Sequence, residues 1–181
     1  MNNSLFNLIR SGGYILYAKH GEASVEVEQP DLNLQCCFTR RNLSEAGRRQ
    51  VVNYGEALRT LRIPVSYPIL VSHLCRAIET GQLAFGRDKI QADPFLFQIY
   101  KLSGNLSSTQ QKKILNFLQS ELEIKPPQGS NRVIIAHSFP KGIGLGEITD
   151  MGTVVIRPLG RDKGYEIVTK LSLEDLGNLA R

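Results

Sequence analysis

Residues 15–22 have the sequence ILYAKHGE, in which an apolar run ends at a basic residue, a histidine and a glycine. A short apolar run rich in branched and aromatic side chains predicts a buried strand. A second such run, residues 133–136, is followed in the same way by His137 and Ser138. Two of the three histidines in the chain therefore follow predicted buried strands, where open α/β sheets place their functional side chains.

The pattern of the rest of the chain predicts one domain, residues 1–181, with strands and helices in alternation. This alternation favours a three-layer α/β/α sandwich with a mostly parallel sheet and an antiparallel edge. A long loop is expected at residues 21–41, and either Asn42 or Ser44 can cap the helix that follows. The remaining expectations are a Gly-rich helical turn at residues 139–145, strands at 14–18, 67–71, 89–92 and 133–136, helices at 4–10, 44–62, 72–84, 107–121 and 173–179, and a hairpin formed by 153–157 and 165–170.

Composition limits the classes of partner. The net charge is +5, which suits an anionic substrate. There is no tryptophan and no basic tract interleaved with aromatic residues, so nucleic-acid binding is not expected.

The N-terminal stretch has neither the pattern of a signal peptide nor an apolar run long enough to cross a membrane. The three cysteines, Cys36, Cys37 and Cys75, have no metal-binding spacing, and we expect reduced thiols and a cytoplasmic location.

Chemistry-bearing side chains gather after three of the predicted strands. Lys19 and His20 follow the first, Ser72 and Arg76 follow the second, and His137 follows the fourth. Because parallel strands end at the same edge of a sheet, these side chains would share one crevice. A guanidinium and an ammonium can hold an anion there, and a neutral imidazole is a competent nucleophile toward phosphorus. The set therefore points to phosphoryl chemistry.

Each of these residues also has a simpler interpretation when taken alone. His20 could be a structural imidazole at a strand end, and His137 could be a core histidine. Arg76 could pair with Glu79 one helical turn away. A shared functional site is favoured only because all three residues follow strands that are expected to end at the same edge of the sheet.

Four segments, taken in order, resemble the histidine phosphatase superfamily, whose members have the phosphoglycerate mutase-like fold. The family pattern is an apolar strand into Arg-His-Gly, a Leu-Thr/Ser-x-x-Gly helix start, a Ser-x-x-x-Arg-Ala-x-x-Thr segment and a strand into a second histidine. The matching segments are ILYAKHGE, NLSEAGRRQ, VSHLCRAIETGQLAFG and VIIAHS, which span residues 14–157 of this chain with the parts between them.

The resemblance implies a metal-independent phosphatase that needs no cofactor. His20 would attack phosphorus and become phosphorylated, Arg76 and His137 would bind the phosphoryl oxygens, and water would release phosphate. Lys19, Gly21, Asn42 and Ser138 are the further residues expected to bind the substrate. The partner would be a phosphorylated small molecule or a phosphoprotein, whereas the sequence does not indicate the natural substrate or the oligomeric state.

Two positions depart from the family pattern. Lys19 stands where the family has arginine, so the charge is kept but the planar fork is lost. Gln98 stands where a glutamate of the family donates a proton to the leaving group. Glu147, which follows the His137 loop, is the expected substitute, and Glu22, Glu28 and Asp93 are the other acids considered.

These departures leave other functions open. The first is a catalytically impaired member that binds a phosphorylated ligand or partner without turnover. The second is a purely structural α/β domain that binds no anion. A mutase is disfavoured because mutases carry longer insertions with extra basic residues than this chain does.

Overall fold

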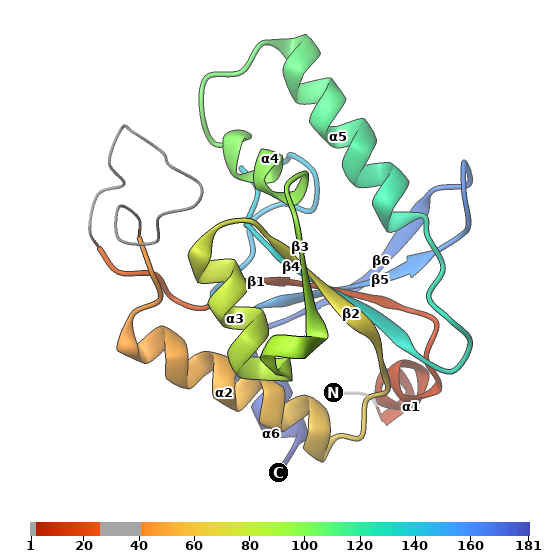
Figure 1. Cartoon of the computed structure of the whole chain (residues 1–181). Helices are drawn as coiled ribbons and strands as arrows, with labels where there is room; N and C mark the ends of the chain where they lie inside the picture. The colour runs from red at the N-terminus through yellow and green to blue at the C-terminus, as the bar shows by residue number, and fades with distance from the viewer. Residues whose placement is uncertain (1–2, 26–40) are drawn as a thin grey trace.

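A computed structural model of the protein describes residues 3–25 and 41–181, and its centre is a six-stranded sheet in the order β3-β2-β4-β1-β5-β6 (Figure 1). β3, β2, β4 and β1 are parallel, β5 runs antiparallel to β1, and β6 runs antiparallel to β5. The expected parallel sheet with an antiparallel edge is confirmed. The strands are β1 Ile15–Lys19, β2 Val65–Ser72, β3 Ile90–Asp93, β4 Asn131–Ala136, β5 Thr153–Pro158 and β6 Tyr165–Leu171.

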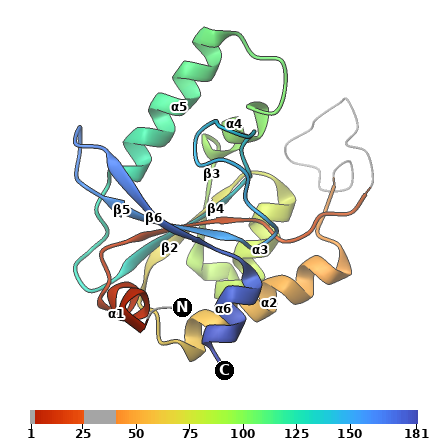
Figure 2. The same cartoon turned by 180° about the vertical axis from the view of Figure 1, so that it is seen from behind.

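Helices cover both faces of the sheet, as Figures 1 and 2 show. In the view of Figure 1, α4 and α5 lie above the sheet, and α2, α3 and α6 lie below it. The three-layer sandwich is therefore confirmed. The helices are α1 Asn3–Ser11, α2 Glu45–Thr60, α3 Cys75–Phe85, α4 Leu96–Lys101, α5 Ser108–Leu122 and α6 Leu173–Leu179, with a 3-10 turn at Arg87–Lys89.

The continuous apolar run of β1 follows from burial on both faces of the sheet. Successive side chains of a strand point to opposite faces. Leu16 and Ala18 pack in the hydrophobic cluster between the sheet and helices α2 and α3, whereas Ile15 and Tyr17 pack in the cluster between the sheet and helices α4 and α5. A strand covered on both sides needs apolar residues at every position, which is why ILYA shows no alternation.

Two expected elements differ from the structure, and one helix was not expected. α3 begins at Cys75 rather than at Ser72, because Ser72 is the last residue of β2 and Leu74 is still extended, with φ −74° and ψ 138°. Residues 139–145 form turns without a helix, and Gly142 and Gly144 there have positive φ, which interrupts a right-handed helix. α4 was not predicted, because six residues are too few to show a helical period.

The segment before α2 lies against residues 22–24. Ser44, not Asn42, caps the helix: its hydroxyl accepts the N–H of Gly47 and donates to Glu22 Oε1 at 2.6 Å. A Cβ on Gly47 would lie 2.1 Å from the carbonyl oxygen of Glu22, so only glycine allows α2 to approach this closely. The Gly47 of the sequence motif thus sets the distance between α2 and the segment after His20.

Cys75 forms a disulfide, so the expectation of a reduced thiol is wrong for this residue and no longer supports a reducing compartment. The other two cysteines of the chain, Cys36 and Cys37, lie outside the described residues. Within residues 3–25 and 41–181, no helix is both long and apolar enough to cross a membrane.

Asn131, which is fully buried, ties together the ends of three segments. Its amide nitrogen donates to the carbonyls of Ile9 and Pro64, and its side-chain oxygen accepts the N–H of Tyr14. We expect Asn131→Ala to lower the free energy of unfolding by about 2 to 4 kcal/mol, because it leaves the Tyr14 N–H without its partner and opens a small cavity. Urea denaturation followed by circular dichroism measures this change.

Ser130→Ala is the matched control. The Ser130 hydroxyl makes a hydrogen bond at the surface to the carbonyl of Pro127, three residues earlier, so its loss should change stability by less than about 0.5 kcal/mol. Equal effects of the two substitutions would contradict the role given to Asn131.

Candidate active site

A cavity of about 310 Å³ lies where β1 and β4 end. The register of the parallel pair β1 and β4 places Lys19 opposite Ala136, so the next residues, His20 and His137, leave the sheet side by side. Their rings meet edge to face, with centroids 5.4 Å apart. The cavity is lined by Lys19, His20, Glu22, Ala23, Arg41, Arg76, Tyr100, Ser103, His137, Ser138 and Asp150.

The hydrogen bonds of His20 define its tautomer. Nδ1 lies 2.7 Å from the carbonyl oxygen of Gly21, and because a carbonyl can only accept, Nδ1 carries the proton. Nε2 therefore has a free electron pair, which accepts a hydrogen bond from Nε of Arg76 at 3.1 Å. The unprotonated nitrogen of His20 thus faces a guanidinium inside the cavity.

Arg76 is held on the first turn of α3 and is buried, with 4% of its surface exposed. Thr80, one turn later, donates to the Arg76 carbonyl at 2.7 Å and accepts the N–H of Gly21 at 3.3 Å. This hydroxyl links α3 to the residue after His20. Glu79 forms its ion pair with Arg48 at 2.6 Å. The surface pairing with Glu79 that was considered for Arg76 is therefore made by Arg48.

His137 is buried and is linked to the end of β2. Its Nε2 lies 2.7 Å from the hydroxyl of Ser72, and its carbonyl accepts the hydroxyl of Tyr17 at 2.8 Å. Nδ1 is also buried and has no hydrogen-bond partner among residues 3–25 and 41–181. A buried polar atom without a partner is costly in a folded protein, and this atom belongs to a residue that lines the cavity.

Both imidazoles are neutral at pH 7. Burial, followed by the charge of Arg76, lowers the pKa of His20 to about 3. Burial also holds the pKa of His137 well below its usual value, and the neighbouring His20 and Arg76 add to this effect. A neutral His20 keeps its Nε2 electron pair across the physiological pH range.

The lining of the cavity carries more positive than negative charge, because three cations face two carboxylates. Lys19 donates to Asp150 Oδ1 at 2.5 Å. Glu22 accepts the hydroxyl of Ser44, and Arg41 donates to the carbonyl of Ser24. Asp150 thus gives Lys19 a carboxylate partner at the cavity.

The structure brings Lys19, His20, Arg76, His137 and Ser138 of the predicted site residues into the cavity lining. Gly21 and Asn42 do not line it. Gly21 is buried under α2, where a Cβ would lie 2.8 Å from both the Gly47 carbonyl oxygen and a Val51 methyl group. The Asn42 carbonyl accepts the N–H of Ser24.

The acids considered as proton donors lie in different places. Glu147 is exposed and lines a pocket beside the cavity, with which that pocket shares Ser103 and Ser138. Asp93 accepts the N–H of Phe95 at the turn before α4. Glu22 lines the cavity itself, and Glu28 lies outside the described residues.

Gln98 is not in the cavity. It faces a separate pocket between α4 and α5, together with Lys101 and Gln110. Its position therefore gives no structural basis for treating it as a replaced proton donor.

Five lining residues were missed by sequence reasoning: Ala23, Arg41, Tyr100, Ser103 and Asp150. Tyr100 comes from α4, lies 5.3 Å from the guanidinium carbon of Arg76 and has its ring centroid 5.6 Å from that of His137. Asp150 precedes β5, and because β5 is antiparallel to β1, its beginning lies at the edge where β1 ends. That geometry is the signal that could have found Asp150, whereas Tyr100 had none.

Within residues 3–25 and 41–181, no group of three or more histidine, cysteine, aspartate and glutamate side chains is placed to hold a metal ion.

No protein-family model matches the sequence, and no curated protein matches it. Solved structures do match. The protein histidine phosphatase SixA, complexed with tungstate, has a TM-score of 0.57 and 15% identity, and the match covers 90% of this chain and 99% of that one. The fold is phosphoglycerate mutase-like.

Two other solved structures with this fold come from different enzymes. A mutant phosphoserine phosphatase of Entamoeba histolytica, in complex with phosphoserine, has a TM-score of 0.54 and 16% identity over 90% of this chain and 98% of that one. A phosphoglycerate mutase of Bacillus anthracis has a TM-score of 0.53 and 13% identity over 93% and 97%. The fold predicted from the ordered motifs is confirmed.

Proposed function

We propose that the protein is a metal-independent phosphatase, acting through a phosphohistidine intermediate on His20. One observation carries the proposal: the unprotonated Nε2 of a buried, neutral His20 faces Arg76 in a cavity with an excess of cations. The substrate class is a phosphorylated small molecule or a phosphorylated protein side chain. The solved structures with the same fold include phosphatases, which supports the proposal.

In the first step, the phosphoryl group enters the cavity, and one of its oxygens accepts the hydrogen bond that Nε–H of Arg76 donates to His20 in the free protein. The electron pair on Nε2 of His20 is released by this exchange and forms the N–P bond, while the bond from phosphorus to the leaving oxygen breaks. The guanidinium can bind two phosphoryl oxygens at once because it is a planar fork. Its charge stabilises the transition state, in which negative charge is spread over these oxygens.

His137 and Lys19 would complete the oxygen binding. When the Ser72 hydroxyl donates to Nε2 of His137, the proton of the neutral ring is on Nδ1, the buried atom that has no partner among the described residues. A phosphoryl oxygen would accept that proton in a hydrogen bond. Lys19 would add a compact positive charge, and Asp150 holds its ammonium in place. The Ser138 hydroxyl would also contact the substrate, and Gly21 and Asn42 would act through the segments that they position.

Proton transfer is assigned to Glu147. A leaving group that extends from the cavity into the adjoining pocket would meet this carboxyl across the rim formed by Ser103 and Ser138. Glu147 would give its proton to the leaving oxygen in the first step. In the second step water attacks phosphorus, the P–N bond returns its electrons to Nε2 of His20, and Glu147 takes the proton of the water.

Rapid-quench kinetics with p-nitrophenyl phosphate tests the proposal. We expect a burst of nitrophenol close to the enzyme concentration when hydrolysis of the intermediate is the slower step. Protein quenched in alkali should carry phosphate that is released by acid, because a phosphoramidate is stable to base and labile to acid. Both signals should survive an excess of chelator. Phosphate that stays on the protein in acid, or turnover that chelator abolishes, would contradict the proposed mechanism.

A further inference from the structure

The pocket beside the cavity is large enough to hold the rest of a substrate. Its volume is about 500 Å³, and we call it the leaving-group pocket. It shares Ser103 and Ser138 with the cavity that holds His20, so one ligand can occupy both. Its lining consists of Ser103, Ser138, Phe139, Pro140, Glu147, Ile148 and Thr149.

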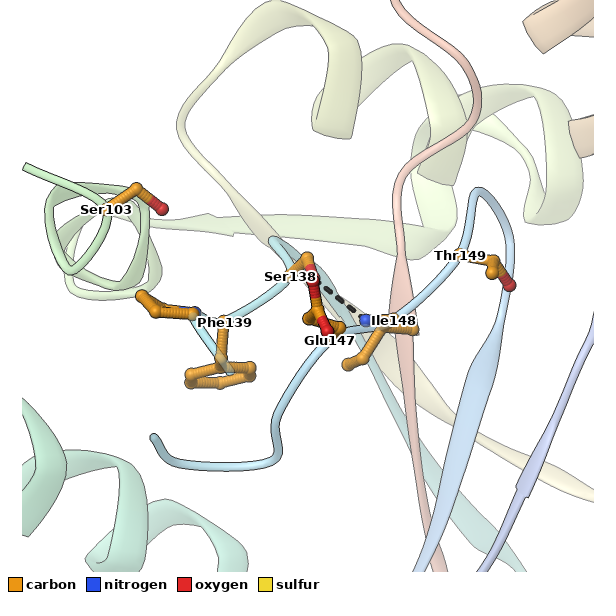
Figure 3. A pocket seen from close by; sticks show the side chains of 7 residues that line it. Ser103, Ser138, Phe139, Glu147, Ile148 and Thr149 are labelled. Atoms are coloured by element: carbon orange, nitrogen blue, oxygen red, sulfur yellow. Dashed lines mark hydrogen bonds between the residues drawn. The ribbon is translucent and has the colours of Figure 1, made fainter. Parts of the chain in front are cut away.

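Ring packing and a hydrogen bond support the walls of the leaving-group pocket. Phe139 is buried, and its ring packs against that of Tyr17, with centroids 5.7 Å apart. The Ser138 hydroxyl accepts the N–H of Ile148 at 2.8 Å, which connects the two ends of the loop formed by residues 138–148. In Figure 3, Ser103 lies across from Ser138, and the ring of Phe139 lies below them in that view. The pocket therefore offers an apolar wall and hydroxyl groups at its rim.

The charge of this lining is opposite to that of the cavity. Among the described residues that line the pocket, the charged side chain is Glu147, which is exposed. Lys170 lies behind the loop, and its ammonium donates to the carbonyls of Leu145 and Glu147. An anion in the cavity is thus attracted by cations, whereas a second anion in the pocket meets a carboxylate.

We propose that the leaving-group pocket selects substrates with a single anionic group, whose leaving part is an uncharged, partly apolar alcohol or phenol. This inference rests on the proposed function, because it places the phosphoryl group in the cavity beside His20. A second phosphate or carboxylate on the leaving group is disfavoured because it lies beside Glu147, which gains negative charge as it gives its proton to the leaving oxygen in the first step. Substrates with two phosphates, or with a phosphate and a carboxylate, are therefore poor.

Two esters of equal shape test the selection: 3-carbamoylphenyl phosphate, which is neutral on its ring, and 3-carboxyphenyl phosphate, which is anionic. We expect kcat/KM to be about five- to tenfold higher for the carbamoyl ester, the size expected for one charge pair near 4 Å in a largely aqueous setting. The ratio of the two kcat/KM values is the readout, since it cancels any common effect on the chemical step.

Thr149→Lys places a cation at the exposed rim of the pocket and should bring that ratio down to about twofold or reverse it. Thr149→Gln is the control for side-chain length and should keep the ratio of the wild type. Asn178→Lys is the control for net charge, because Asn178 is exposed on α6 on the other side of the sheet. It should leave both kcat/KM values unchanged within about twofold.

The outcomes separate this inference from the proposed function. Equal kcat/KM for the two esters, with turnover that depends on His20, would overturn the pocket inference and leave the phosphatase standing. A ratio that Thr149→Lys and Asn178→Lys change equally would also overturn it, because the effect would then be general. Turnover of neither ester would overturn both.

Discussion

Replacement of His20 by alanine is expected to lower kcat for p-nitrophenyl phosphate by about 10⁴-fold or more, the size seen when the nucleophile of a covalent mechanism is removed. Alanine has no atom that can form the phosphoenzyme, so the burst should vanish with the turnover. Steady-state and rapid-quench assays on the same preparation measure both. Because the Nε2 atom of His20 is the proposed attacking group, KM should change much less than kcat.

His73→Ala is the matched control for His20→Ala. His73 is the one histidine besides His20 and His137 in the sequence. It is half-buried between β2 and α3 and does not line the cavity. Its replacement should leave kcat within about twofold of the wild type. Turnover by His20→Ala above about one per cent of the wild-type value, with the fold intact by circular dichroism, would rule out a phosphohistidine on this residue.

Replacement of Arg76 by alanine is expected to lower kcat/KM by about 10³-fold, the size typical of losing a charged group that stabilises transferring phosphoryl oxygens. Arg76 is the buried guanidinium in contact with Nε2 of His20, so the change removes both the charge and the fork. The rise in melting temperature that inorganic phosphate gives the wild type should also be lost. Arg76→Lys keeps the positive charge but loses the planar fork of the guanidinium. Its kcat/KM should therefore lie between those of the wild type and Arg76→Ala.

Arg48→Ala controls for the loss of an arginine near the same helix. Arg48 is exposed and pairs with Glu79 on α3, and it does not line the cavity. Its removal should alter kcat/KM by less than about twofold, because an exposed ion pair contributes little. If Arg76→Ala kept both its activity and its response to phosphate, the cavity would not be the phosphoryl site.

The predictions that succeeded rest on local patterns that have a physical cause. A strand buried on both faces must be apolar throughout, so ILYA and VIIA could be recognised as inner strands. Parallel strands end at one edge, so the histidines that follow these two runs, His20 and His137, could be placed together. The register of β1 and β4 puts them side by side.

The predictions that failed concern segments whose conformation is determined by distant contacts. Gln98 aligned with a family position in sequence, but α4 turns it toward α5 and away from His20. Cys75 forms a disulfide, although the spacing of the cysteines gave no indication of a bond.

The sequence by itself determined the layers, the parallel centre of the sheet and the two imidazoles at its edge, because doubly buried strands are continuous apolar runs and their alternation with helices is visible along the chain. The tertiary structure decided which other side chains enter the cavity. Tyr100, Arg41 and Asp150 come from a short helix and two connections, and they meet Arg76 and Lys19 only because the sheet brings those segments to one edge. Such meetings depend on contacts between residues far apart in the chain, which no local pattern of residues records.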